Sequence, residues 1–150
     1  MTKETITLAI FKPDVQRIWA FRRLAELAIH NIGLKILLQR EFRMSKSAAE
    51  SFYAAHKGKF FYDRLVNYMI SGPIGVYVLS GDSAITRWRQ LIGPTKVYRA
   101  VLFEPDSLRG TLGLTDTRNG FHGSGEYSKE SAQEEISFFF PELDIQQLLK

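Results

Sequence analysis

One histidine of the chain stands in a setting that suits covalent chemistry. His122 lies in the run 118–124 (RNGFHGS), where flanking glycines leave the imidazole uncrowded and let the backbone approach a ligand. A neutral imidazole can attack through one ring nitrogen while the other donates a hydrogen bond that fixes the tautomer. The sequence therefore predicts a nucleophilic His122 with a carboxylate partner. The plain alternative is a surface histidine without a role, which His30 and His56 fit better.

Basic side chains supply the second requirement of such chemistry. Phosphoryl transfer needs positive charge around the migrating group, which arginine supplies as a two-pronged donor and lysine as a point charge. The candidates are Lys12, Arg89, Arg99, Arg109 and Arg118. Each alone is typical of a solvated surface, but five together with a glycine-flanked histidine favour a phosphate site. The chain contains neither the P-loop pattern nor the glycine pattern of dinucleotide-binding folds, which excludes both kinds of site.

An aromatic pair, Phe60 and Phe61, directly follows Gly58 and Lys59. Two interpretations are equally open: both rings pack in the core, or one of them stacks on a nucleobase. Stacking tolerates any base, because every base has a π-face. An aromatic platform of this kind would therefore give little selectivity among nucleotides.

The composition predicts one globular domain. A chain of 150 residues has the size of a single domain, and 45% hydrophobic with 24% charged residues is ordinary for a folded protein. The absence of cysteine excludes disulfides, thiolate metal sites and a thiol nucleophile. No signal-peptide pattern opens the chain, and no apolar run approaches the roughly 20 residues of a membrane span. We therefore expect a cytoplasmic or mitochondrial protein without a membrane partner.

Periodicity and turn residues predict the elements that must position these side chains. Strands are expected over 5–11, 34–44, 74–79 and 119–122. Helices are expected over 16–31, 48–56, 60–70, 84–92 and 128–139, with a short helix or tail over 142–150. A capping box at 47–50 begins the second helix, and Gly33 ends the first.

The order of these elements predicts the fold class. Residues 94–118 show little periodicity, and a structureless segment of that length is usually functional. Strands separated by helices suit an open sheet covered on one face. We predict an α/β sandwich of ferredoxin-like type, in which helices cover a four-stranded antiparallel sheet and a long loop contributes to the phosphate site.

Four motifs together resemble the nucleoside diphosphate kinase family. They are Lys12-Pro13-Asp14 after a strand, Trp88-Arg89 before Gly93-Pro94-Thr95, Leu108-Arg109-Gly110, and the run 118–124. The resemblance covers about residues 5–140, and the stretches 58–66 and 110–119 are similar to the divergent sixth-type branch. It implies the same ferredoxin-like fold and one kinase domain over residues 1–150.

The resemblance also implies a reaction. His122 would be phosphorylated by a nucleoside triphosphate and would pass the phosphate to a nucleoside diphosphate in a ping-pong cycle. The phosphates would be bound by Lys12, Arg89, Thr95 and Arg109. Mg²⁺ would bridge phosphate oxygens, without ligands from the protein.

The same resemblance assigns the residues around the sugar, the base and the imidazole. Asn119 with Lys12 would hold the sugar hydroxyl, and Phe60 would stack on the base. The residues lining the histidine would be Tyr53 and Ser124. A carboxylate would orient the imidazole through its non-reacting nitrogen. The matched residue is Glu135, with Glu134 as a competitor.

The chain departs from the family's usual pattern in several places, among them Gly125, where an acidic residue is common, and about two extra residues before Glu135. After Asp14 it runs on through residues 15–18 without the usual small residue, which alters the start of the first helix. The segment between Thr95 and Arg109 is longer than usual, and Asp116 stands where an apolar residue is common. The longer segment leaves open whether the protein forms a homo-oligomer or binds a heterologous protein.

Two other functions stay open on these residues. The longer segment favours a weakly active family member that acts mainly as a protein-binding partner. The basic isoelectric point and the aromatic pair suit a nucleic-acid binder. The glycine-aromatic motif of RNA-recognition modules is absent, however, which argues against nucleic acid as the partner.

Overall fold

A four-stranded antiparallel sheet lies at the centre of the structure, a computed structural model that describes residues 4–124 and 129–148. The strands are β1 (Glu4–Phe11), β2 (Lys35–Phe42), β3 (Ile74–Asp82) and β4 (Phe121–Gly123). They pair in the order β2-β3-β1-β4. This strand order, with helices in the connections, is that of a ferredoxin-like fold and confirms the predicted class.

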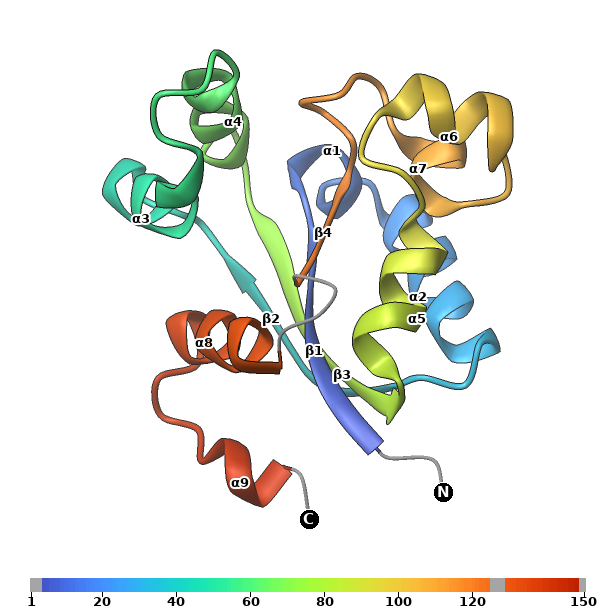
Figure 1. The fold of residues 1–150 in the computed structure, drawn as a ribbon, viewed down its shortest axis with the longest axis vertical. Coiled ribbons are helices and arrows are strands. Elements are labelled where there is room, and N and C mark those ends of the chain that lie inside the picture. The colour runs from blue at the N-terminus through green and yellow to red at the C-terminus, as the bar shows by residue number, and fades with distance from the viewer. Residues whose placement is uncertain (1–3, 125–128, 149–150) are drawn as a thin grey trace.

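Helices cover both faces of this sheet, as Figure 1 shows. They are α1 (Pro13–Gln16), α2 (Trp19–Asn31), α3 (Lys46–Phe52), the 3₁₀ turn η1 (Ala54–His56), α4 (Tyr62–Met69), α5 (Ala84–Ile92), α6 (Val97–Phe103), α7 (Leu108–Leu112), α8 (Lys129–Phe139) and α9 (Ile145–Leu148). Helices α3, α4 and α8 lie on one side, and α2, α5, α6 and α7 on the other. The expectation of a sheet covered on one face is therefore wrong. Of the helices in the described ranges, none is both long and apolar enough to cross a membrane.

Strand β1 explains why both faces are covered. Its residues Ile6–Phe11 are buried without interruption, as in sheets that pack on both faces. Side chains alternate across a strand, so Leu8 and Ile10 join one core cluster and Ala9 and Phe11 join the other. The two clusters pack against the two helix layers. The sheet therefore lies between the two halves of the core and contributes side chains to both.

The first predicted helix is interrupted near its start. Instead of one helix over 16–31, the chain forms α1 and α2, with Ile18 in an extended conformation between them. The buried Gln16 donates from Nε2 to Glu41 Oε1 at 2.9 Å, and Arg22 Nη1 donates to the Gln16 carbonyl at 2.8 Å. These two bonds favour the break, and a helical periodicity cannot reveal them.

Two helix boundaries test the predicted caps. Helix α2 ends as predicted, because Gly33 follows it with a φ of 86°, a conformation that favours glycine. Helix α3 begins earlier than predicted. Its cap is Ser45, whose Oγ accepts a hydrogen bond from the Ala48 N–H at 3.1 Å. The capping box predicted at 47–50 is therefore wrong.

Residues 94–118 are not the structureless loop that their composition predicts, because they contain α6 and α7. Helix α6 buries Val97 and Ala100 but exposes Tyr98 and Leu102, so its apolar residues form no one-sided stripe. Helix α7 starts after Ser107, whose Oγ accepts from the Gly110 N–H at 3.1 Å. The two short helices pack against each other, and this tertiary contact stabilises what local sequence alone does not.

Leu8 provides a test of the two-sided core. Leu8→Ala removes a fully buried side chain from the middle of β1 and leaves a cavity. We expect the free energy of unfolding to fall by about 2–5 kcal/mol. The matched control is Leu102→Ala, where the side chain is exposed on α6 and the change stays within about 0.5 kcal/mol. Urea denaturation followed by circular dichroism measures both, and equal losses would contradict this packing.

Candidate active site

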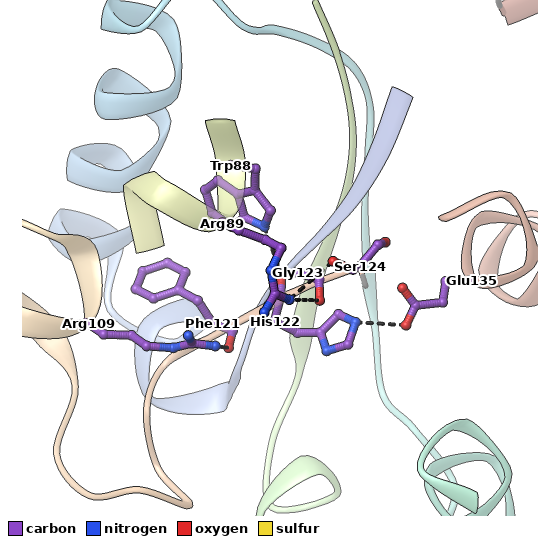
Figure 2. Close-up of polar contacts among 8 residues, drawn as sticks. All are labelled: Trp88, Arg89, Arg109, Phe121, His122, Gly123, Ser124 and Glu135. Carbon is purple, nitrogen blue, oxygen red and sulfur yellow. Dashed lines mark hydrogen bonds and ion pairs between the residues drawn. The ribbon is translucent and has the colours of Figure 1, made fainter. Parts of the chain in front are cut away.

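His122 lies on the short edge strand β4, which begins at Phe121 rather than at the predicted residue 119. Backbone pairing with β1 places His122 opposite Ile10. The indole Nε1–H of Trp88, from α5, donates to the His122 carbonyl at 3.0 Å (Figure 2). The histidine therefore projects from a backbone that is held on both sides.

Glu135 on α8 is the carboxylate that meets the imidazole. His122 Nε2 lies 2.8 Å from Glu135 Oε2, and the two side chains are 18% and 22% exposed (Figure 2). Its neighbour Glu134 is exposed to solvent. The structure thus brings Glu135, and not the competing Glu134, to the histidine.

The electrostatics of this pair fix which ring nitrogen carries hydrogen. Burial raises the pKa of Glu135, but the hydrogen bond and charge of His122 outweigh it, with smaller contributions from Ser124 and Arg89. The pKa of this carboxyl is therefore held below its ordinary value. An ionised carboxylate can only accept, so Nε2 of His122 is the donor. In the neutral ring, Nδ1 then keeps a lone pair free for attack.

Aromatic side chains form a wall beside the imidazole. The Tyr53 ring centroid lies 6.2 Å from that of His122 with the planes at 83°, and the Phe52 ring lies at 5.2 Å. Burial raises the pKa of Tyr53 above its ordinary value, so its hydroxyl stays protonated. Within the described residues this buried hydroxyl has no hydrogen-bond partner. A predicted lining residue therefore offers a donor beside the histidine, and Phe52 is an addition that sequence reasoning missed.

Lys12 and Asn119, which are both expected to hold the sugar hydroxyl, contact each other. Lys12, only 4% exposed at the end of β1, donates from Nζ to Asn119 Oδ1 at 3.0 Å. The Asn119 amide nitrogen donates in turn to the carbonyl of Thr95 at 3.4 Å. Burial, and then the charge of Arg109, lower the pKa of Lys12 to about 7. A bound anion would favour the charged form of this lysine.

Arg89 and Arg109 converge on the strand that carries the histidine (Figure 2). Arg109 is 7% exposed and donates to the carbonyls of Gly93 and Phe121, each at 2.8 Å. Arg89 donates from Nη1 to the carbonyls of Gly123 and Ser124 at 3.4 and 3.2 Å. Burial, and then the charge of Arg89, lower the pKa of Arg109 to about 10. The two guanidinium groups concentrate positive charge while fixing the backbone around His122.

Three other predicted residues lie outside this group. Phe60 is 85% exposed and meets the Phe61 ring edge-on at 5.5 Å. Arg99 is exposed on α6. Arg118 instead lines a cavity, with its guanidinium carbon 5.9 Å from the centroid of Tyr68.

That cavity, of about 840 Å³, adjoins the cationic side chains. Its lining comes from α4 and the following turn (Arg64, Asn67, Tyr68, Ser71), from α6 (Val97, Tyr98), and from residues 114–118. Tyr68 connects it to the site, because the Lys12 ammonium lies 5.9 Å from the Tyr68 ring. The volume suits a small organic ligand. The sequence did not point to Tyr68, since its place in a buried helical stripe is typical of a core residue.

Comparison with known proteins identifies the family. The model of the nucleoside diphosphate kinase family matches residues 5–145. Nucleoside diphosphate kinase 6 of Danio rerio is 47% identical over 145 residues, which cover 95% of this chain and 79% of that protein. The Homo sapiens protein of the same name is 45% identical over 141 residues, which cover 94% and 75%.

Solved structures agree with this match. An orthorhombic crystal form of the Aquifex aeolicus nucleoside diphosphate kinase has a TM-score of 0.83 and 37% identity, covering 91% of this chain and 95% of that one. A Halobacterium salinarum nucleoside diphosphate kinase in complex with CDP has a TM-score of 0.81 and 28% identity, covering 98% and 99%. The chain therefore belongs to the nucleoside diphosphate kinase family and is similar to its sixth-type branch.

Proposed function

We propose that this chain is an active nucleoside diphosphate kinase that works by a ping-pong mechanism through phosphorylated His122, with residues 1–150 acting as one domain. The observation that carries the proposal is the contact between His122 Nε2 and Glu135 Oε2, 2.8 Å long. It orients the ring and leaves Nδ1 as the nucleophile, which is the requirement for a covalent phosphoryl carrier.

The cycle consists of two half-reactions. In the first, Nδ1 of His122 bonds to the γ-phosphorus of a nucleoside triphosphate while the bridging P–O bond breaks, and the diphosphate leaves with that electron pair. In the second, a β-phosphate oxygen of another diphosphate attacks the same phosphorus, and the P–N electrons return to Nδ1. The attacking nitrogen has no proton to lose. Glu135 stabilises the positive charge that develops on the ring.

Positive side chains around β4 are proposed to stabilise the migrating phosphoryl group. Lys12, Arg89 and Arg109 lie around the histidine strand, and their charge is available as negative charge builds on the phosphate oxygens. The buried Tyr53 hydroxyl can donate to the phosphate on His122. Ser124 is fully buried beside the strand, and its hydroxyl, which has no hydrogen-bond partner among the described residues, is a further donor available at this site.

Mg²⁺ is proposed to enter together with the nucleotide. Within residues 4–124 and 129–148, no group of three or more His, Asp or Glu side chains could hold a metal ion. The donors around His122 are mainly cationic or neutral, which fits phosphate oxygens rather than a metal. Phosphate oxygens are hard ligands of the kind that Mg²⁺ prefers. The ion bound there would neutralise part of the phosphate charge.

The cavity beside Tyr68 is the proposed place of the sugar and the base. The Halobacterium neighbour was solved with CDP, which supports a nucleoside diphosphate as ligand of this family member too. Asn119, held by Lys12 and by the Thr95 carbonyl, would meet the sugar hydroxyl, and the Thr95 side chain a phosphate. Phe60 stays the proposed stacking ring, because its exposed face can accept any base.

The covalent step is tested by labelling. Purified wild type incubated with ATP labelled at the γ-phosphate should acquire acid-labile, base-stable phosphate, because Nδ1 of His122 displaces ADP. His122→Ala should acquire none, whereas His30→Ala, an exposed histidine on α2, should label like wild type. An unlabelled wild type, or a labelled His122→Ala, would end the proposal.

The orienting role of Glu135 is tested by a matched pair. Glu135→Gln keeps an acceptor oxygen but loses the charge that stabilises the imidazolium. We expect the first-order rate of labelling to fall by about 10- to 100-fold, the range for outer partners that orient a histidine. Glu134→Gln, on the exposed side of α8, should leave the rate unchanged. Quenched-flow labelling measures both rates, and a larger effect at Glu134 would reverse the assignment.

Lys12 predicts a pH dependence of nucleotide binding. Its pKa of about 7 means that the free protein loses this proton above neutral pH, whereas a bound polyphosphate favours the charged form. Affinity for ADP should therefore fall as pH rises from 7, by up to about tenfold per unit for one proton taken up. Calorimetric titration at pH 7, 8 and 9 measures it. Lys12→Met should flatten the curve, and the exposed Lys46→Met should not; an unchanged slope in Lys12→Met would refute this origin.

A further inference from the structure

Asp116 is an exposed residue that lines the cavity. It stands where the family usually has an apolar residue, and it lines the cavity together with residues of α4 and α6. Its carboxylate does not merely face solvent. Oδ1 accepts a hydrogen bond from the backbone N–H of Val97, 19 positions earlier in the chain, at 3.1 Å.

This hydrogen bond caps helix α6 from a distance. The residue before the helix, Lys96, has no side-chain oxygen and makes no cap. The first N–H groups of a helix have no partner inside it and need an acceptor from elsewhere. The Asp116 carboxylate provides one at Val97, and its negative charge suits the positive end of the helix. The start of α6 is thereby tied to the segment 114–118.

A second link joins the same two segments through Asn119. Its amide nitrogen donates to the Asp116 carbonyl at 3.1 Å and to the Thr95 carbonyl at 3.4 Å. Its oxygen accepts from the Lys12 ammonium at 3.0 Å. Asn119 can bridge the two carbonyls only while the segments keep their spacing. The bond from Val97 to Asp116 lies beside this bridge and fixes that spacing.

We infer that Asp116 is a positioning residue for nucleotide binding, which holds α6 and the Asn119 amide at the distance that a nucleoside diphosphate requires. The inference rests on the proposed function, and it concerns the affinity of the cavity rather than the chemistry of the histidine. Trp88 and Glu135 hold His122, and Arg109 holds the neighbouring Phe121 carbonyl. None of these hydrogen bonds involves Asp116. Loss of the carboxylate should therefore weaken nucleotide binding and spare the reactivity of Nδ1.

Three variants separate these effects. Asp116→Ala removes the acceptor, and the KM for the diphosphate acceptor should rise by about two- to tenfold, the size of one ordinary hydrogen bond at an exposed residue. Asp116→Asn keeps an acceptor oxygen and should restore most of the wild-type KM. Asp106→Ala is the control, because Asp106 is an exposed residue in the turn between α6 and α7.

A donor without a nucleoside supplies the second readout. Phosphoramidate can phosphorylate His122 by releasing ammonia, and it makes no use of the cavity. Its labelling rate should be the same in Asp116→Ala and wild type, while the labelling rate with subsaturating ATP falls. Equal KM values in Asp116→Ala and wild type, or a parallel loss with both donors, would overturn the positioning role. A wild type that neither donor labels would instead end the proposed function.

Discussion

The candidate site depends on how the carbonyl groups of β4 are held. A strand of three residues at the edge of a sheet has few ladder bonds of its own. Side-chain donors from other elements complete the set: the Trp88 indole bonds His122, and the guanidinium of Arg109 bonds Phe121. Arg89 adds bonds to the next two carbonyls. These bonds fix the backbone of β4 and so hold the His122 imidazole against the Glu135 carboxylate on α8.

This arrangement gathers cations in a place where water is scarce. Two of them, Lys12 and Arg109, are almost fully buried, and burial disfavours their charged forms. Lys12 Nζ donates to Asn119 and the two Nη groups of Arg109 donate to backbone carbonyls, whereas Arg109 Nε has no hydrogen-bond partner among the described residues. A bound polyphosphate would neutralise these cations and reduce the repulsion between them. A bound anion would therefore favour the charged forms of Lys12 and Arg109.

The sequence supported the fold class and the residues nearest the reaction. The strand–helix order indicated the ferredoxin-like class, and the run around His122 pointed to the proposed nucleophile. Lys12 was a phosphate candidate from its charge, and the match at Glu135 came from family resemblance. The structure places Lys12 against Asn119 and Glu135 against His122. Local patterns failed where tertiary contacts decide. Gln16 and Glu41, 25 positions apart, form a hydrogen bond at the break in the first predicted helix. Packing against α7 stabilises α6.

The pairing of β4 with β1 also limits how this protein can vary. Because alternate side chains point to opposite faces, His122 reaches Glu135 only while it stands across from Ile10. A shift of one position would turn the imidazole toward the layer that holds Trp88. Insertions in the segment between α5 and α7 leave that alignment untouched, whereas any change in chain length between Asn119 and His122 does not. Chain length is therefore constrained between Asn119 and His122 and less constrained between α5 and α7.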